Sequence, residues 1–146
     1  MHITRFTDYS LRILLYMAAK DGKLSTIQEM ANAYEISKNH LMKIVQDLNS
    51  RGYVHAVRGK NGGVTLNKSP AEINVGKLVN ELEGKSNLLE CFGPDNKCVI
   101  ANSCRLKKPF AQAVNAFYKA LEEYTLQDIL SVTDIDDMCQ VLNIAS

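Results

Sequence analysis

The period of the hydrophobic pattern changes at Gly52, and this change limits the folds open to the chain. Before Gly52, apolar residues recur at the spacing of amphipathic helices. After it, two extended apolar segments, Tyr53–Arg58 and Val64–Leu66, flank the glycine-rich stretch Gly59–Gly63, a pattern that predicts a β-hairpin. Short helices followed by a hairpin are typical of a winged helix-turn-helix, so we expect a mainly α fold with a small β-wing.

Three helices are predicted before the hairpin. The first covers about residues 7–20. The second begins after Thr26, which forms a capping box with Glu29. The third begins after Ser37, another capping residue, and runs to about Arg51. The short turn between the second and third helices makes them a helix-turn-helix.

A short helix over Val75–Glu83 and a longer one starting at Pro109 are predicted beyond the hairpin. The longer helix carries an apolar stripe with little preceding core to cover it, so pairing with a second copy of the chain is the favoured arrangement. Packing back onto the first helix is the alternative. Another short helix is expected from Thr125, and the last dozen residues are expected to fray. The stripe consists of Phe110, Ala113, Val114, Phe117 and Leu121.

The predicted elements divide the chain into three parts. Residues 1–83 form a winged helix-turn-helix DNA-binding domain, with the helix-turn-helix at about 26–51 and the wing at about 53–66. Residues 84–108 form a loop that contains three cysteines. Residues 109–146 form a dimerisation helix and a C-terminal tail.

Charge is distributed unevenly, although the formal net charge is only +1. Between Lys38 and Lys68 there are six basic residues and a single acid, Asp47. After Lys119 there are six acidic residues and no basic one. A basic middle segment favours contact with phosphates, whereas a solvated basic helix face is the alternative that charge alone leaves open.

The third helix and the hairpin tip carry side chains suited to DNA. The first turns of a recognition helix reach base edges in the major groove, and a cationic wing suits phosphates or a narrow minor groove. The tip lacks the Walker spacing, so its glycines do not predict a nucleotide site. A helix-turn-helix without DNA would leave the same residues merely exposed. The candidate DNA contacts are Thr26, Ser37, Lys38, Asn39, His40, Lys43, Arg58, Lys60, Asn61, Gly62 and Gly63.

Three cysteines, Cys91, Cys98 and Cys104, lie in one polar, turn-rich stretch. Their spacing is wider than the CxxC pairs of zinc ribbons and thioredoxin-like sites. Thiolates bind iron–sulfur clusters and zinc alike, so a cluster, a zinc site, a thiol–disulfide switch and unrelated thiols all remain open. A four-ligand site would need one further group. The candidates are Cys139, His2, His55, Asp8 and an exogenous ligand.

The sequence also indicates where the protein acts. No apolar run approaches the roughly 20 residues that a bilayer requires, so no membrane partner is expected. The amino terminus is charged early and has no apolar region of a secretory signal. We therefore expect a cytoplasmic protein, in which thiols are free or metal-bound rather than paired in disulfides.

Four segments resemble a known family. They are residues 7–12 (Thr-Asp-Tyr-Ser-Leu-Arg), 36–43 (Ile-Ser-Lys-Asn-His-Leu-Met-Lys), 57–63 (Val-Arg-Gly-Lys-Asn-Gly-Gly) and the three-cysteine loop. Together they are similar to the winged-helix iron–sulfur regulators, and within them to the branch of nitric-oxide-sensing transcriptional repressors. The resemblance covers nearly the whole chain.

The resemblance implies a homodimer with one iron–sulfur cluster per subunit, either 2Fe–2S or 4Fe–4S, which an apo form would lack. Cys91, Cys98 and Cys104 would hold the cluster, and Asp8 of the other subunit would supply the fourth ligand. Asp8 as a simple helix N-terminal charge is the alternative.

The implied function is transcriptional repression, not catalysis. The dimer would bind a pseudo-palindromic, A·T-rich operator in double-stranded DNA. Cluster nitrosylation would release that operator and derepress nitric-oxide detoxification genes. The alternatives are a regulator that senses iron or cluster supply, a DNA-binding thiol or zinc redox switch, and an iron–sulfur electron carrier or redox enzyme.

Overall fold

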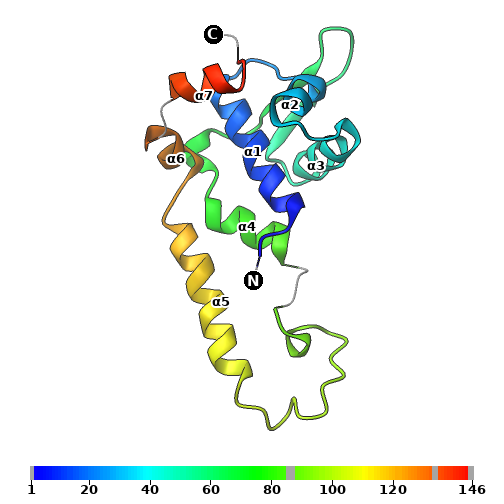
Figure 1. Ribbon diagram of the computed structural model, residues 1–146, viewed down its shortest axis with the longest axis vertical. Coiled ribbons are helices and arrows are strands. Elements are labelled where there is room, and N and C mark those ends of the chain that lie inside the picture. The colour runs from blue at the N-terminus through cyan, green and yellow to red at the C-terminus, as the bar shows by residue number, and fades with distance from the viewer. Residues whose placement is uncertain (1, 85–87, 133–134, 145–146) are drawn as a thin grey trace.

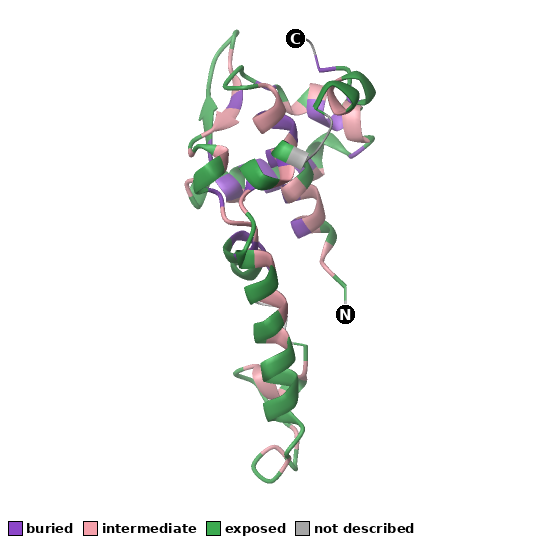
Figure 2. Ribbon diagram, turned by 90° about the vertical axis from the view of Figure 1, so that its left-hand side faces the viewer, coloured by how far each residue is buried: buried purple, intermediate pink, exposed green. Residues whose placement is uncertain are grey.

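The computed structural model describes residues 2–84, 88–132 and 135–144. Figure 1 shows a head at one end of the molecule, from which the helix α5 extends to a loop at the other end. In Figure 2 the buried residues gather in the head, while α5 is largely exposed. In chain order the elements are α1 (Arg5–Ala19), α2 (Ile27–Tyr34), α3 (Lys38–Ser50), β1 (Val54–Val57), β2 (Gly63–Leu66), η1 (Pro70–Glu72), α4 (Val75–Glu83), η2 (Glu90–Phe92), α5 (Lys107–Glu122), α6 (Leu126–Val132) and α7 (Ile135–Val141).

The core of the head is built around α1. Ile13, Leu14 and Met17 are almost completely buried, at helical spacing along one face. The helix begins at Arg5, two residues before the predicted start, because the side chain of Thr4 accepts a hydrogen bond from the backbone N–H of Thr7. The fully buried residues Met30, Leu41, Ile44 and Leu48 of α2 and α3 join this core.

The helix-turn-helix begins and ends where its capping residues predict. The hydroxyl of Thr26 accepts from the N–H of Glu29 at 3.1 Å, and the hydroxyl of Ser37 accepts from the N–H of His40 at 3.3 Å. Glu35 ends α2 in a left-handed conformation, with φ of 54°, which turns the chain sharply into α3. The predicted second and third helices are thus confirmed.

The wing is the predicted hairpin, with β1 and β2 antiparallel and Val54 opposite Leu66. A backbone bridge that the hydrophobic pattern did not predict ties it to the segment before α2. Ser25 and Val64 exchange two N–H to C=O hydrogen bonds of 2.8 and 2.7 Å. A Cβ on Gly63 would lie 2.9 Å from the carbonyl oxygen of Ser25, so this close approach requires glycine.

The long helix α5 joins the head where its last turns cross α4. A Cβ on Gly76 would lie 2.6 Å from Cγ of Glu122 and 2.7 Å from the carbonyl oxygen of Tyr118, so the two helices meet backbone to backbone. The side-chain amide of Asn74 donates to the carbonyl oxygen of Glu122 at 2.7 Å. The N–H of Val75 donates to the carbonyl oxygen of Tyr124 at 2.9 Å. We call this contact the α4–α5 joint.

The remainder of α5 makes little contact with its own chain. None of its residues is buried, and within the described ranges its main helical neighbour is α4 rather than α1. Its first turn starts at Lys107, two residues before Pro109. Among the described residues the predicted apolar stripe is therefore only partly covered: Phe110 is exposed, and Val114 and Phe117 are half-buried.

The C-terminal segment returns to the head, and the expectation of a frayed end was wrong for residues 135–144. Thr125 caps α6 with Asp128, as predicted. Leu126, Leu142 and Ile144 are buried in the same core as α1. Within the part of the chain that the structure describes, no helix is long and apolar enough to cross a bilayer.

Substitution Gly76→Ala should lower the free energy of unfolding by about 1–3 kcal/mol, because the new methyl group overlaps the backbone of α5. Urea unfolding followed by circular dichroism measures the change. Lys77→Ala, at the next and exposed position of α4, is the control and should stay within about 0.5 kcal/mol of the wild type. Equal stability of the two variants would show that α4 and α5 do not meet at Gly76.

Candidate nucleic-acid interface and cysteine loop

The recognition helix α3 presents three polar side chains to solvent in its first two turns. Lys38, Asn39 and Lys43 are exposed, as the sequence predicts. His40 is only half-buried, and its ring meets the ring of Tyr9 edge-on, with 5.2 Å between ring centroids. Lys38, Asn39 and Lys43 can therefore meet DNA directly, whereas His40 also belongs to a contact inside the head.

A cleft of about 310 Å³ lies between α2, α3 and the wing. Thr26, Lys38, Gly62 and Gly63 line it, so the structure brings together predicted contacts from three elements. Gln28 also lines it, although it was not among the predicted contacts, which on the helices lie mainly on the outer face of α3. A polar residue two positions after the Thr26 cap is the signal that could have identified it.

The wing tip is a tight turn rather than an open loop. The N–H of Gly62 donates to the carbonyl of Gly59 at 3.0 Å, which leaves Lys60 and Asn61 exposed at the apex beside Arg58. A Cβ on Gly62 would overlap the carbonyl oxygen of Val57. Gly62 and Gly63 are thus needed for the shape of the wing, and Lys60 and Asn61 supply its polar groups.

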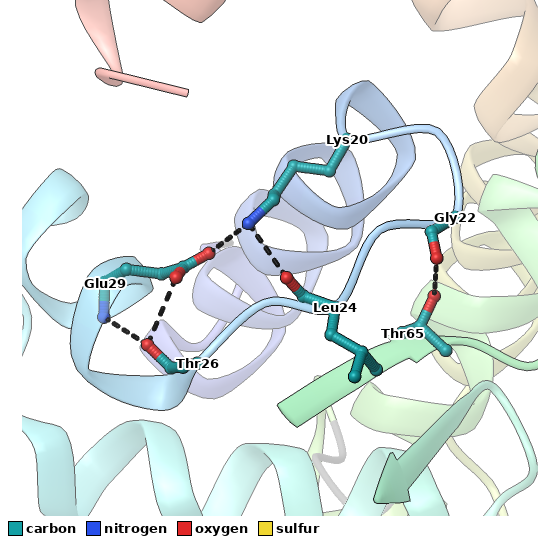
Figure 3. A network of polar contacts seen from close by, with 6 residues as sticks. All are labelled: Lys20, Gly22, Leu24, Thr26, Glu29 and Thr65. Atoms are coloured by element: carbon teal, nitrogen blue, oxygen red, sulfur yellow. Dashed lines mark hydrogen bonds and ion pairs between the residues drawn. The ribbon is translucent and has the colours of Figure 1, made fainter. Parts of the chain in front are cut away.

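A network of polar contacts fixes the start of α2 (Figure 3). The ammonium group of Lys20, just after α1, donates to the Glu29 carboxylate at 2.5 Å and to the carbonyl of Leu24 at 2.9 Å. The hydroxyl of Thr26 donates to the same carboxylate at 3.2 Å. The Thr26 hydroxyl also accepts from the Glu29 N–H, and its one hydrogen is already donated to Glu29.

Asp8 lies in the first turn of α1 and is paired with Arg12, one turn later. The Nε and Nη2 atoms of Arg12 donate to the two carboxylate oxygens at 3.0 and 2.8 Å. Both side chains remain more than two-fifths exposed. These hydrogen bonds to Asp8 raise the pKa of Arg12, whose guanidinium is charged at any ordinary pH. The Asp8 carboxylate is accessible at the surface, but it is not free.

The loop that joins α4 to α5 holds the three predicted thiols. Cys91 lies in η2, and Cys98 and Cys104 lie in the following turns; each is half-buried and none forms a disulfide. Three thiols suit iron or zinc chemically. They do not converge, since the described residues contain no group of three His, Cys, Asp or Glu side chains close enough to hold a metal ion. Asp8, on the head, is not part of such a group either.

The end of α4 is tied to the start of α1. The buried Glu83 carboxylate accepts hydrogen bonds from the N–H of Thr4 at 2.8 Å and from its hydroxyl at 2.7 Å. Beside it lies a cavity of about 380 Å³, with Phe92 of η2 and Phe117 of α5 in its walls. The cysteine loop therefore starts at the same point of the fold as the helix that carries Asp8.

These features define the class of the protein: a winged-helix DNA-binding regulator with a thiol-bearing loop outside its DNA-binding head. The sequence model of the Rrf2 family, described as iron-dependent transcriptional regulators, matches residues 3–132. The chain belongs to this family. It is a transcriptional regulator and not an enzyme.

Relatives of this chain are also named transcriptional regulators. The chain is 44% identical over 136 residues to the HTH-type transcriptional regulator NsrR of Bacillus licheniformis, covering 92% of this chain and 95% of the relative. It is 42% identical over 144 residues to NsrR of Bacillus subtilis, covering 97% of each chain. The family resemblance that the sequence indicated is thus confirmed, and these relatives are named NsrR.

Solved structures confirm the predicted fold class. The structure of CymR, the global cysteine regulator of B. subtilis, matches with a TM-score of 0.70 and 26% identity over 92% of this chain and 99% of CymR. The structure of T. potens IscR matches with a TM-score of 0.69 and 21% identity over 90% of this chain and 87% of that one, which is a likeness of fold alone.

Glu29 should make the stability of the head depend on acid pH. Burial would raise the pKa of Glu29, but hydrogen bonds from Lys20 and Thr26 hold it below its ordinary 4.5. The unfolded chain then binds the proton more readily, so this stabilisation is present above pH 4.5 and is lost as the pH falls through the folded-state pKa. Urea unfolding of Glu29→Gln at a series of pH values should show a shallower decline below pH 4.5 than the wild type.

Lys20→Met provides a second variant for the same measurement. It removes the ammonium donor and leaves the carboxylate, so it should also flatten the decline. If both variants kept the wild-type slope, the acid sensitivity would arise elsewhere.

Proposed function

We propose that this chain is a homodimeric transcriptional repressor that senses nitric oxide through an iron–sulfur cluster, 2Fe–2S or 4Fe–4S, held by its loop. Cys91, Cys98 and Cys104 would hold the cluster, with Asp8 of the partner subunit as fourth ligand. The protein would act in the reducing cytoplasm on a pseudo-palindromic operator. The observation that carries this proposal is a loop of three unpaired, half-buried thiols attached to a winged-helix head.

The donor set supports a reactive iron site. When bound, the cluster would supply iron that reacts with nitric oxide. Carboxylate oxygen is a weaker ligand for iron than thiolate, so the position bound by Asp8 would be the one most open to attack. The thiols of the loop would have to move together to bind metal, since they do not converge in the described conformation. Coupling of metal binding to local folding is common for such loops.

Ligation of Asp8 would compete with its pair to Arg12. Both of its carboxylate oxygens accept hydrogen bonds from Arg12. Ligation in the partner's loop would weaken the hold of Asp8 on the Arg12 guanidinium, and loss of that ligation would restore the pair. This exchange gives the head two distinct states, and a signal can shift their populations only through its different affinity for each.

A second copy of the chain is the partner that best covers α5. Among the described residues its apolar stripe is only partly covered, with Phe110 exposed and Val114 and Phe117 half-buried along one face. Helix-turn-helix dimers bind two half-sites about one DNA turn apart. Control of the separation between the two heads would therefore control operator binding and the derepression of nitric-oxide detoxification genes.

The thiols also permit a different regulator on the same frame. Because the three cysteines are free thiols and thiolates bind zinc as well as iron, a disulfide or zinc switch without iron is the second candidate. Metal analysis distinguishes zinc from iron, and mass spectrometry of the alkylated protein detects a disulfide.

Nitric oxide should release the operator in step with loss of the cluster's visible absorbance. The probe is a duplex enriched from a random library by the anaerobically purified, cluster-loaded protein, with binding and absorbance recorded on the same samples. Cys98→Ser should lose both the absorbance and the nitric-oxide response. Cys139→Ala, which changes a cysteine on α7, is the control and should keep both. A colourless wild-type protein that binds DNA regardless of nitric oxide would contradict the proposal.

Lys60→Ala should weaken binding to all DNA sequences by a similar factor, because Lys60 at the wing apex suits phosphate rather than base contact. The slope of log K against log salt should fall by about 0.9, the loss of one phosphate contact. Lys119→Ala makes the same charge change at an exposed position of α5 and should keep the wild-type slope. A slope unchanged by Lys60→Ala would remove this side chain from the interface.

A further inference from the structure

A chain of side-chain contacts leads from Asp8 to the recognition helix. Arg12, which is paired with Asp8, has its guanidinium carbon 5.5 Å from the centroid of the Tyr9 ring. The same ring also meets the ring of His40 edge-on, with 5.2 Å between centroids and 68° between ring planes. Asp8, Tyr9 and Arg12 lie within two turns of α1, and His40 lies in the first turn of α3.

The backbone of this part of α1 is held independently of the Asp8–Arg12 pair. The hydroxyl of Tyr34 on α2 donates to the carbonyl oxygen of Arg12 at 2.9 Å. Burial raises the pKa of Tyr34 to about 12, so this hydroxyl stays protonated and continues to donate. Loss of the Asp8 pair would therefore free the guanidinium of Arg12 while its main chain stays in place.

The Tyr9 ring contacts both Arg12 and His40, so loss of the Asp8–Arg12 pair changes its environment. A guanidinium near an aromatic face is attracted to it, and more strongly when no carboxylate competes for the cation. A shift of Arg12 over the ring changes the space left for the edge contact with His40. Because the N–H of His40 is bound by the Ser37 cap, movement of the imidazole acts at the beginning of the recognition helix.

We propose that Tyr9 is a positioning residue that couples the pairing state of Asp8 to the orientation of His40 in the recognition helix. This inference rests on the proposed function for its biological role, since ligation of Asp8 is what would change the pairing state. In this proposal His40 contacts DNA and, through its ring contact with Tyr9, also responds to changes in α1.

The coupling can be tested without any cluster. The chain has three histidines, His2, His40 and His55, so His40→Gln assigns the imidazole NMR signal of His40 in the cluster-free protein. Asp8→Asn breaks the charge pair with Arg12. It should shift the His40 signal in the wild-type background and leave it in place in a Tyr9→Leu background, while His55 in the wing stays unchanged in both.

Tyr9→Phe is the matched control, because it keeps the ring that touches both Arg12 and His40. It should restore the response of His40 to Asp8→Asn. A response of equal size in the Tyr9→Leu background, or no response in either background, would overturn the proposal. If Tyr9→Leu does not fold, as judged by circular dichroism, the same comparison is made with Tyr9→Met.

Operator binding then separates this inference from the proposed function. The measured quantity is the ratio of operator affinity between cluster-loaded and cluster-free protein. Tyr9→Leu should reduce that ratio by about 2-fold to 30-fold, the range typical of coupling residues, with visible absorbance unchanged. If the wild-type protein binds the operator equally well with and without the cluster, the proposed function is contradicted. The NMR comparison alone then decides whether Tyr9 couples Asp8 to His40. A wild-type ratio well above one that Tyr9→Leu preserves would overturn the role of Tyr9.

Discussion

The close crossing of α4 and α5 at Gly76 is the contact on which the layout of the molecule depends. Without a side chain at Gly76, the backbone of α4 meets the last turns of α5, and Asn74 and Val75 add hydrogen bonds to the same turns. Along the rest of its length α5 has no buried residue. The α4–α5 joint therefore sets the direction in which the long helix leaves the head, and with it the position of the cysteine loop.

A second connection runs from the loop to the head through the end of α4. Glu83 precedes the loop and accepts two hydrogen bonds from Thr4, which caps the helix that carries Asp8. The buried carboxylate of Glu83 therefore connects the start of the cysteine loop to the start of α1, the helix that carries Asp8. In the proposed dimer, Asp8 would bind the cluster of the other subunit, so a displacement of the loop would affect α1 through Glu83 as well as through the partner.

Much of the head was predictable because its signals are local. The caps at Thr26 and Ser37 lie next to the helices they start, and the glycines of the wing lie between its two strands. The start of α1 was missed because Thr4 gains its position partly from Glu83, 79 residues away. The return of the C-terminal segment was missed because the burial of Leu142 and Ile144 depends on the surface that α1 and its neighbours offer.

The candidate functional residues also divide into features set by local sequence and features set by long-range packing. The sequence by itself determined which side chains are available: basic and amide groups on α3 and the wing tip, three thiols in one loop, and a carboxylate in the first turn of α1. Residue types are read directly from the sequence, and helical spacing is a pattern of residues close together along the chain. The pairing of Asp8 with Arg12, one helical turn apart in α1, is also local. Only the tertiary structure decided that His40 rests against Tyr9 and that Glu83 accepts hydrogen bonds from Thr4. These relations depend on how helices distant in sequence pack together, which no local pattern encodes.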